Sequence, residues 1–238
     1  MSRRLKIKER LKVSPRAETG VVVKDGTWRS LLQAAQDCLC ETGYAGLSTR
    51  RVAEKAQVPL SQIHYHFGSK QGLVLTLLAD QNERLLYRQA TTFSKSMPLS
   101  KRWARACDYL DEDLSSGYVR ILQEMIAAGW SDPKVAEAVR QNLRGWYELL
   151  TSLAKEAGDK FGGLGPFTAS EVASLVGNAF VGSEAIILLG LENLQIPARA
   201  SLRKFGKLIS LMEKQGDRST GSKKRVAKVR ADKKRAAK

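Results

Sequence analysis

The 238-residue sequence predicts an all-α protein, and three observations lead to this fold class. Apolar residues recur at helical spacing through most of the chain between residues 27 and 215. Residue types that start and stop helices fall between these runs. No run alternates apolar and polar residues as a strand would. The three valines at residues 21–23 are too few and too isolated to form a strand. The predicted helices group into a small N-terminal unit and a larger body.

Three short helices are predicted near the N-terminus. The first covers residues 27–43, and its apolar positions share one face: Trp28, Leu31, Leu32, Ala35, Cys38 and Leu39. Ser48 and Thr49 can cap the second helix, which ends at a short break over residues 57–59. The third helix covers residues 60–67. Three helices with a tight break before the third are what a helix-turn-helix requires.

Cap residues place the longer helices that follow. Gly68 provides a left-handed stop for the third helix, and Ser69 provides a new cap for a long fourth one. Further along, Asp132 is a cap that is followed by Pro133 at the first helical position. These signals indicate that the helical pattern continues well beyond the N-terminal unit.

The C-terminal part of the body is predicted to hold the most apolar helix. Residues 158–166 are interpreted as a loop, and residues 168–171, with the sequence TASE, form a capping box. The helix that follows, residues 168–191, is apolar nearly all round, as a helix buried on two sides must be. Pro197 opens a last helix that reaches about residue 214.

Positive charge is concentrated at the two ends of the chain. The formal net charge is +16, of which residues 1–26 carry +5 and residues 216–238 carry +8. Both ends lack a sustained apolar period, so residues 1–26 are predicted to be a flexible arm and residues 216–238 a disordered tail. Basic ends of this kind fit a polyanion such as DNA, although they also fit solvated termini without a partner.

Composition argues against several other classes of protein. Three cysteines without a disulfide spacing, and no apolar signal segment, predict a protein of the reducing cytoplasm. The longest apolar run, residues 185–189, is far shorter than a bilayer span of about 20 residues, so no membrane span is predicted. Contact of the basic ends with a membrane surface has no support in the sequence, so no membrane partner is expected. No phosphate-binding loop, dinucleotide fingerprint, zinc spacing or nucleophile with its base is found. We therefore expect neither an enzyme nor a cofactor.

Some residues that attract attention have simpler explanations. His64 and His66 are two apart on a helix and point about 200° apart, so they cannot share a metal ion. Cys38 lies on the apolar face of the first helix, and Trp28 is interpreted as a core anchor in preference to a base-stacking platform. The acidic residues 111–113 are interpreted as a solvated helix face.

The third helix carries the chemistry of the N-terminal unit. Only Ile63 and Phe67, one helical turn apart, are suited to face inward. A helix this short buries too little to serve the core alone. Its other side chains are polar or amphipathic and are long enough to reach base edges and phosphates: Ser61, Gln62, His64, Tyr65 and His66.

Three stretches together resemble the DNA-binding domain of the tetracycline-repressor (TetR) family. The first stretch begins with LLQAA at residues 31–35 and ends with ETGY at residues 41–44. The second is STRRVAEKA at residues 48–56, and the third is IHYHFGSKQGL at residues 63–73. The resemblance implies a helix-turn-helix domain over residues 27–74 that binds double-stranded DNA. Gln57 stands where the family commonly has glycine, Pro59 where it has serine, and His64 where it has tyrosine.

The resemblance also assigns roles to single residues. It places Ser48, Thr49 and Lys70 on phosphates, and Arg50 within reach of a guanine. On the third helix it places Leu60, Ser61, Gln62 and His64 at bases, and Tyr65 and His66 against the DNA backbone.

For residues 75–215 the resemblance implies a ligand-binding and dimerisation domain. The helices at 168–191 and 197–214 would pair with their symmetry mates, and a small-molecule effector would alter the spacing of the two reading heads. Polar or amphipathic residues within apolar helices are candidates for the effector pocket, although surface or core packing explains them equally well: Trp130, Asn142, Trp146, Tyr147, Asn178 and Glu184.

The sequence thus predicts a homodimeric, ligand-responsive transcription regulator, usually a repressor in this family, that binds a palindromic operator. An alternative from a different class is a nucleoid-associated architectural protein that relies on its basic ends for binding.

Overall fold

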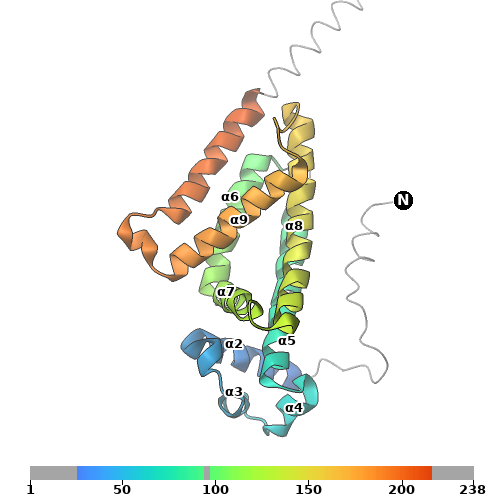
Figure 1. Ribbon diagram of the computed structural model, residues 1–238, viewed down its shortest axis with the longest axis vertical. Helices are drawn as coiled ribbons and strands as arrows, with labels where there is room; N and C mark the ends of the chain where they lie inside the picture. The colour runs from blue at the N-terminus through green and yellow to red at the C-terminus, as the bar shows by residue number, and fades with distance from the viewer. Residues whose placement is uncertain (1–25, 94–96, 216–238) are drawn as a thin grey trace, which may run out of the picture.

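The computed structural model describes residues 26–93 and 97–215, and within them every regular element is a helix (Figure 1). In chain order these are α2 (Gly26–Gly46), α3 (Thr49–Lys55), α4 (Ser61–Phe67), α5 (Lys70–Thr92), α6 (Leu99–Ser115), α7 (Tyr118–Gly129), α8 (Pro133–Phe161), α9 (Ala169–Leu188), the 3-10 turn η1 (Leu191–Leu194) and a last helix over residues 198–215. The predicted all-α class is confirmed. The predicted arm, apart from Gly26, and the predicted tail lie outside the described residues.

Helices α2, α3 and α4 form a three-helix unit at one end of the molecule (Figure 1). Leu31, Val52 and Ile63, one from each helix, are fully buried together. Trp28 is buried, and its ring centroid lies 6.3 Å from that of Phe67, so it is a core anchor as predicted. The unit is therefore held by its own small apolar core.

Side-chain caps begin the helices at the positions where the sequence predicts them. The hydroxyl of Ser69 accepts a hydrogen bond from the Gly72 amide at 3.0 Å, at the start of α5. Asp132 accepts from the Lys134 amide at 2.8 Å at the start of α8. Thr168 and Glu171 form the complete capping box of α9. These bonds satisfy amides that have no partner within their helix.

The turn between α3 and α4 is built around a left-handed residue that is not glycine. The Val58 amide donates to the Ala53 carbonyl and the Gln57 amide donates to the Glu54 carbonyl, both at 3.0 Å, which is a Schellman arrangement. Gln57 lies at its C′ position with φ 56°. The backbone at Gln57 thus has a left-handed conformation that glycine adopts more readily than other residues.

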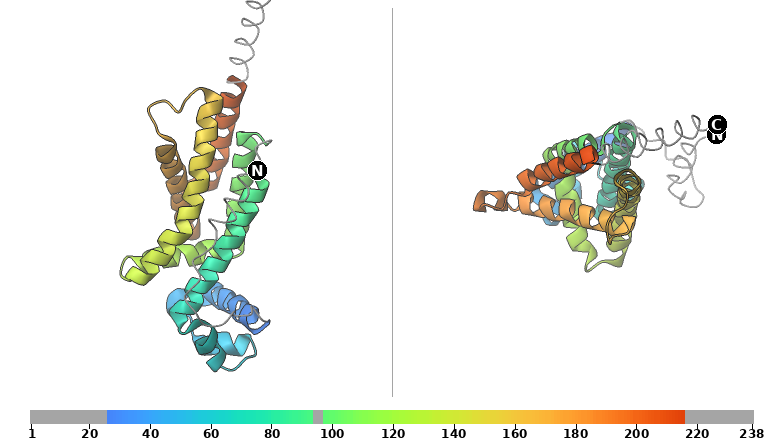
Figure 2. Two further views of the ribbon diagram at one scale, coloured as in Figure 1. Left: turned by 90° about the vertical axis from the view of Figure 1, so that its right-hand side faces the viewer. Right: turned by 90° about the horizontal axis from the view of Figure 1, so that it is seen from above.

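A helical body rises from the three-helix unit along α5, which is continuous across the predicted domain division at residue 75 (Figure 2). Helix α8 packs against α5, α7 and α9. The loop predicted at residues 158–166 begins later than expected, because α8 continues to Phe161 and ends at Gly162 with φ 81°. Gly158 lies within the helix, where Leu164 packs against it.

Helix α9 is less enclosed than its composition predicts. Over an 18-residue window its mean hydropathy is 1.4, so by length and composition alone it is apolar enough to cross a membrane. The sequence analysis found no such run because glycine, serine and asparagine interrupt it. Only 22% of that window is buried within the protein. A large apolar face of α9 thus remains uncovered in the single chain.

Candidate functional site

The outer face of α4 presents polar and aromatic side chains to solvent. Ile63 and Phe67 face the core, as predicted, while Ser61 and His64 are exposed and the Tyr65 side chain is 80% exposed. Leu60, just before the helix, is also exposed. The arrangement gives one short helix an outward surface of hydrogen-bonding groups, as a helix that enters the major groove of DNA needs.

His66 differs from its neighbours on α4. Both nitrogens of its ring are buried and have no hydrogen-bond partner within the described part of the chain. The ring packs edge-on against Tyr65, with centroids 4.9 Å apart. This placement does not favour His66 as a contact to the DNA backbone, and it leaves Tyr65 as the more accessible of the two.

The start of α3 lies beside α4 and contributes a cation. Ser48 caps this helix by accepting from the Arg51 amide at 3.5 Å, and Arg50 is exposed. Arg51 and Lys55 instead bind Glu41 of α2, at 2.6 and 2.8 Å. Arg50 has no ion-pair partner among the described residues, so of these three cations it is the one available to a ligand.

Lys70, at the start of α5, has contacts within the protein. Its Nζ donates to the Ala45 carbonyl at 3.4 Å and stands 4.8 Å from the centroid of the Tyr44 ring. Ser48, Thr49, Arg50, Gln62 and Lys70 therefore all belong to one unit, but the ammonium of Lys70 already has partners that a phosphate would have to replace.

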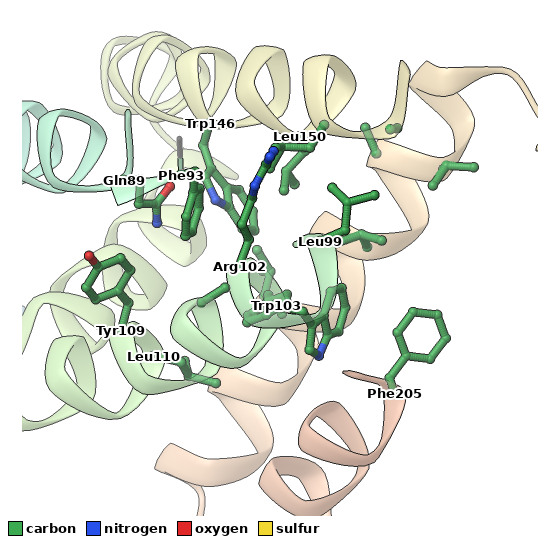
Figure 3. Close-up of a pocket in the computed structure, with 18 of the residues that line it drawn as sticks. Gln89, Phe93, Leu99, Arg102, Trp103, Tyr109, Leu110, Trp146, Leu150 and Phe205 are labelled. Atoms are coloured by element: carbon green, nitrogen blue, oxygen red, sulfur yellow. The ribbon is translucent and has the colours of Figure 1, made fainter. Parts of the chain in front are cut away.

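The helical body encloses a cavity of about 560 Å³ (Figure 3). Helices α5 to α9, the loop after α8 and the last helix all contribute to its wall. The lining is mainly aliphatic and aromatic, with a few polar side chains among them: Asn82, Gln89, Arg102, Asp113, Tyr118, Asn142 and Glu184. A volume of this size and a lining of this kind are typical of small-molecule sites.

The predicted pocket residues divide into two groups. Asn142, Trp146 and Glu184 line the cavity. Trp130, Tyr147 and Asn178 do not, which corrects the predicted pocket. Trp130 ends α7 with its side chain 83% exposed.

Tyr147 and Asn178 lie on the outer side of the contact between α8 and α9. The Tyr147 hydroxyl donates to Asn178 Oδ1 at 2.9 Å. Gly177 makes room for the tyrosine ring, since a Cβ there would stand 2.5 Å from it. The pair therefore joins the two helices beside the cavity instead of lining it.

Hydrogen bonds gather at the end of the cavity nearest the three-helix unit. The Tyr118 hydroxyl donates to Asn82 Oδ1 at 3.4 Å, and Asn82 Nδ2 donates to the Asn142 carbonyl at 3.2 Å. Gln123 Nε2 donates to Glu184 Oε2 at 2.9 Å and to the Val181 carbonyl at 3.0 Å. Helices α5, α7, α8 and α9 thus meet at a polar end.

Burial alters the acid–base behaviour of this end. Loss of solvent raises the pKa of Glu184 to about 7, although the hydrogen bond from Gln123 opposes the rise and the negative charge of Asp113 adds to it. Burial also raises the pKa of Tyr118, with a contribution from Glu184. Glu184 therefore changes charge close to neutral pH.

Arg102, which lines the cavity, and Arg88, which binds the lining residue Asp113, both have partners within the chain. Arg102 forms a bidentate pair with Glu156 at 2.8 and 2.9 Å, and its Nε donates to the Met97 carbonyl at 2.8 Å. Arg88 binds both oxygens of Asp113 at 2.8 Å. Of the acidic run at residues 111–113, which was predicted to be a solvated face, Asp113 is thus largely buried against Arg88, whereas the side chains of Asp111 and Glu112 are 39% and 45% exposed. Sequence reasoning also missed Arg102, because the periodicity of a helix does not reveal a partner 54 residues away.

Helix α7 connects the cavity with the three-helix unit. Gln123 binds Glu184 on the cavity side, and the neighbouring Glu124 accepts the amide of Tyr44 at the end of α2. Arg120 donates to the Cys40 carbonyl at 2.8 Å and to Glu124 at 3.1 Å. Helix α7 therefore contacts both Glu184 at the cavity and α2, which packs against α3 and α4.

An exposed recognition helix on a compact three-helix unit, joined to a body with a large cavity, defines a helix-turn-helix DNA-binding protein. Residues 31–77 match the profile of the bacterial regulatory proteins of the tetR family. The N-terminal unit is thus similar to the DNA-binding domain of the TetR family of transcription regulators.

Similar proteins match about three quarters of the chain. A helix-turn-helix-type transcriptional regulator of Mycobacterium tuberculosis (strain ATCC 25618 / H37Rv) is 27% identical over 193 residues, which span 77% of this chain and 95% of the relative. The crystal structure of FadR from Bacillus subtilis in complex with stearoyl-CoA has a TM-score of 0.65 at 12% identity, covering 76% of this chain and 97% of that one. A regulator from Saccharomonospora viridis in complex with choline has a TM-score of 0.61 at 20% identity, covering 74% and 93%.

Proposed function

We propose that the chain is a ligand-responsive transcriptional repressor that binds a palindromic operator as a homodimer in the cytoplasm. The observation that carries this proposal is that α7 contacts both a cavity of about 560 Å³ and the helix-turn-helix unit. Two similar structures were solved with stearoyl-CoA and with choline, so bodies of this shape bind small molecules. The proposal assigns no enzymatic activity to the chain.

The proposed dimer is supported by an apolar surface on α9, η1 and the last helix. This dimer surface is defined by exposed side chains that do not line the cavity: Leu175, Leu188, Leu189, Leu194, Ile196, Leu208 and Leu211. Exposed large apolar side chains gathered on successive elements in this way are typical of a protein interaction surface. A second copy of the chain covers it best, because two-fold pairing also supplies the second recognition helix that a palindromic site needs.

Phe180 and Ile187 do not belong to this surface. The Phe180 side chain is buried within one chain, where its ring lies 5.4 Å from Trp103 and 6.3 Å from Trp146 between centroids. Ile187 packs against the same core. A helix that is apolar all round does not reveal from sequence which side faces its own chain, so tests of the dimer must use other residues.

Leu208→Asp and Leu211→Asp test the dimer. Each places a charge on the dimer surface, and an unpaired charge there would be buried on association. Sedimentation should show monomers for these variants and dimers for Tyr87→Asp, which alters an exposed residue on α5 outside the dimer surface. Dimers for all three variants would contradict the proposed surface.

The effector response is proposed to pass through α7. A ligand that moves Gln123 acts on the same helix that holds Tyr44 and Cys40 through Glu124 and Arg120. Such a ligand shifts DNA affinity only by the difference in its own affinity for the two arrangements, typically about 5–150-fold.

A footprint on the DNA that flanks the gene tests the whole proposal. A repressor of this kind should protect one short palindromic site, and a small molecule that occupies the cavity should reduce that protection. An architectural protein would instead coat the DNA without a preferred site, and that result would overturn the proposal.

A further inference from the structure

Glu184 is a buried carboxylate with room for a further partner. Its side chain lines the cavity and the residue is only 8% exposed. Oε2 accepts from Gln123 at 2.9 Å, and no donor among the described residues reaches Oε1. A buried carboxylate is costly unless it is paired, so the arrangement asks for a positive group from outside the chain.

Among the described residues, the cavity has no cationic side chain that is free of an ion-pair partner. Its charged lining residues in the described part of the chain are Arg102, Asp113 and Glu184. Arg102 is held by Glu156, and Asp113 by Arg88. Glu184 is thus the unpaired charge of the cavity. An anionic ligand would find no free counter-charge there, whereas a cation would.

Aromatic rings stand beside Glu184. Phe180 precedes it by one helical turn of α9, so both side chains lie on the same face of the helix. The Trp146 ring meets the Phe180 ring edge-to-face at 6.3 Å between centroids. Rings of this kind attract a cation through their faces and receive its alkyl groups.

The other end of the cavity is apolar. Its wall there is formed by the end of α8, the loop that follows and the last helix: Ala154, Ala157, Phe161, Leu164, Phe205, Ile209 and Met212. These segments lie at the end of the body away from the three-helix unit (Figure 1). A ligand that fills the cavity therefore has one charged end and a long apolar remainder.

We propose that the effector is an amphiphilic cation, an amine or quaternary ammonium with an extended hydrocarbon or aromatic part, whose charged group lies against Glu184. The inference rests on the proposed function, because it takes the cavity as the effector site. It adds the chemical class of the effector and the residue that selects it.

The charge of Glu184 gives the binding a characteristic pH dependence. Its pKa is raised to about 7, mainly by burial, so the carboxyl group is neutral below that pH and charged above it. The titratable groups that face it are Tyr118 of α7, Tyr147 of α8 and Asp113 of α6, which Arg88 of α5 holds. A bound cation competes with the proton. Its affinity should therefore rise about tenfold per pH unit below pH 7 and level off above it.

Calorimetry on the full chain tests this with three probes of equal chain length: decyltrimethylammonium, decanoate and decanol. The cation should bind at least about tenfold more tightly than the other two at pH 8. Glu184→Gln keeps the acceptor for Gln123 but removes the charge, so it should cost the cation about tenfold and leave decanol within about twofold. Glu148→Gln removes an exposed carboxylate from α8 outside the cavity and should change none of the three.

The outcomes separate this inference from the proposed function. If decanoate or decanol binds as tightly as the cation, or Glu184→Gln leaves cation binding unchanged, the inference is overturned, even if one of these probes releases operator DNA. If the cation binds through Glu184 but operator affinity does not change, the inference holds and the regulatory proposal fails. Should the Glu184→Gln variant be unstable, the pH profile of the unmodified protein decides, because decanol binding should stay constant where cation binding falls.

Discussion

Glu124→Ala should weaken the contact between α7 and the helix-turn-helix unit. The Glu124 carboxylate accepts the backbone amide of Tyr44 and the Nε of Arg120. The variant keeps one bond between the two parts, because Arg120 Nη1 still reaches the Cys40 carbonyl at 2.8 Å. The three-helix unit should therefore remain folded but be attached less firmly to α7.

The expected cost follows from the exposure of the groups involved. A hydrogen bond to a charged group contributes about 1.5–3 kcal/mol, whereas an exposed ion pair contributes about 0–1 kcal/mol. The side chains of Arg120 and Glu124 are 42% and 29% exposed, so their pair lies near the lower figure. We expect the free energy of unfolding to fall by about 1.5–2 kcal/mol. For a chain of this size that corresponds to a fall in Tm of about 3–8 °C.

Urea denaturation at one protein concentration measures this, because dimerisation makes stability depend on concentration. The control is Glu137→Ala, which removes a 2.7 Å ion pair to Arg140 on the exposed face of α8 and should cost less than about 0.5 kcal/mol. Gly43 provides a second check. A Cβ there would stand 2.9 Å from Glu124 Oε1, and its φ is +69°. Gly43→Ala should therefore cost less in the Glu124→Ala background than alone. Equal effects of Glu124→Ala and Glu137→Ala, or strictly additive effects with Gly43→Ala, would refute the contact as an energetic link.

Three further predictions concern DNA binding and the turn. Arg50→Ala and Gln62→Ala should weaken operator binding by about 1–3 kcal/mol each and affect random duplex much less, while Lys70→Ala should weaken both and reduce the salt slope by about one unit; titrations at several salt concentrations distinguish them. Deletion of residues 216–238 removes eight net positive charges per chain, so affinity for both DNAs and its salt dependence should fall while the preference for operator is kept; loss of that preference would mean that this segment reads sequence. Gln57→Gly should stabilise the fold by about 0.5–1 kcal/mol in urea denaturation, because φ is 56° there, and a destabilised variant would contradict the strain.

Local signals account for what the sequence predicted well. Ser69, Asp132 and Thr168 cap their helices because a short polar side chain needs only the next three residues to find its amide. The inward positions of α4 could likewise be predicted, since Ile63 and Phe67 are the two residues of that helix whose side chains are large and fully apolar. Features of this kind depend on neighbours in sequence.

The lining of the cavity was harder to predict from the sequence, because its walls come from segments that are distant in the chain. Asn142, Trp146 and Glu184 were candidates, but so were Trp130 and Asn178, since a polar residue in an apolar helix has the same pattern whether it faces a cavity or solvent. The outward and inward sides of α9 could not be separated because both are apolar. Only packing against α8 and the core distinguishes them.

The two contacts of α7 lie on consecutive residues, and consecutive residues of an α-helix point about 100° apart. Gln123 and Glu124 therefore cannot be exchanged or shifted by one position without turning each toward the other's partner. Residues deeper in the cavity have no such restriction, because α8, α9 and the last helix supply them without touching Tyr44. The lining of the cavity can therefore vary without altering these two contacts, whereas a single insertion or deletion in α7 between them and the cavity would turn Gln123 and Glu124 away from their partners.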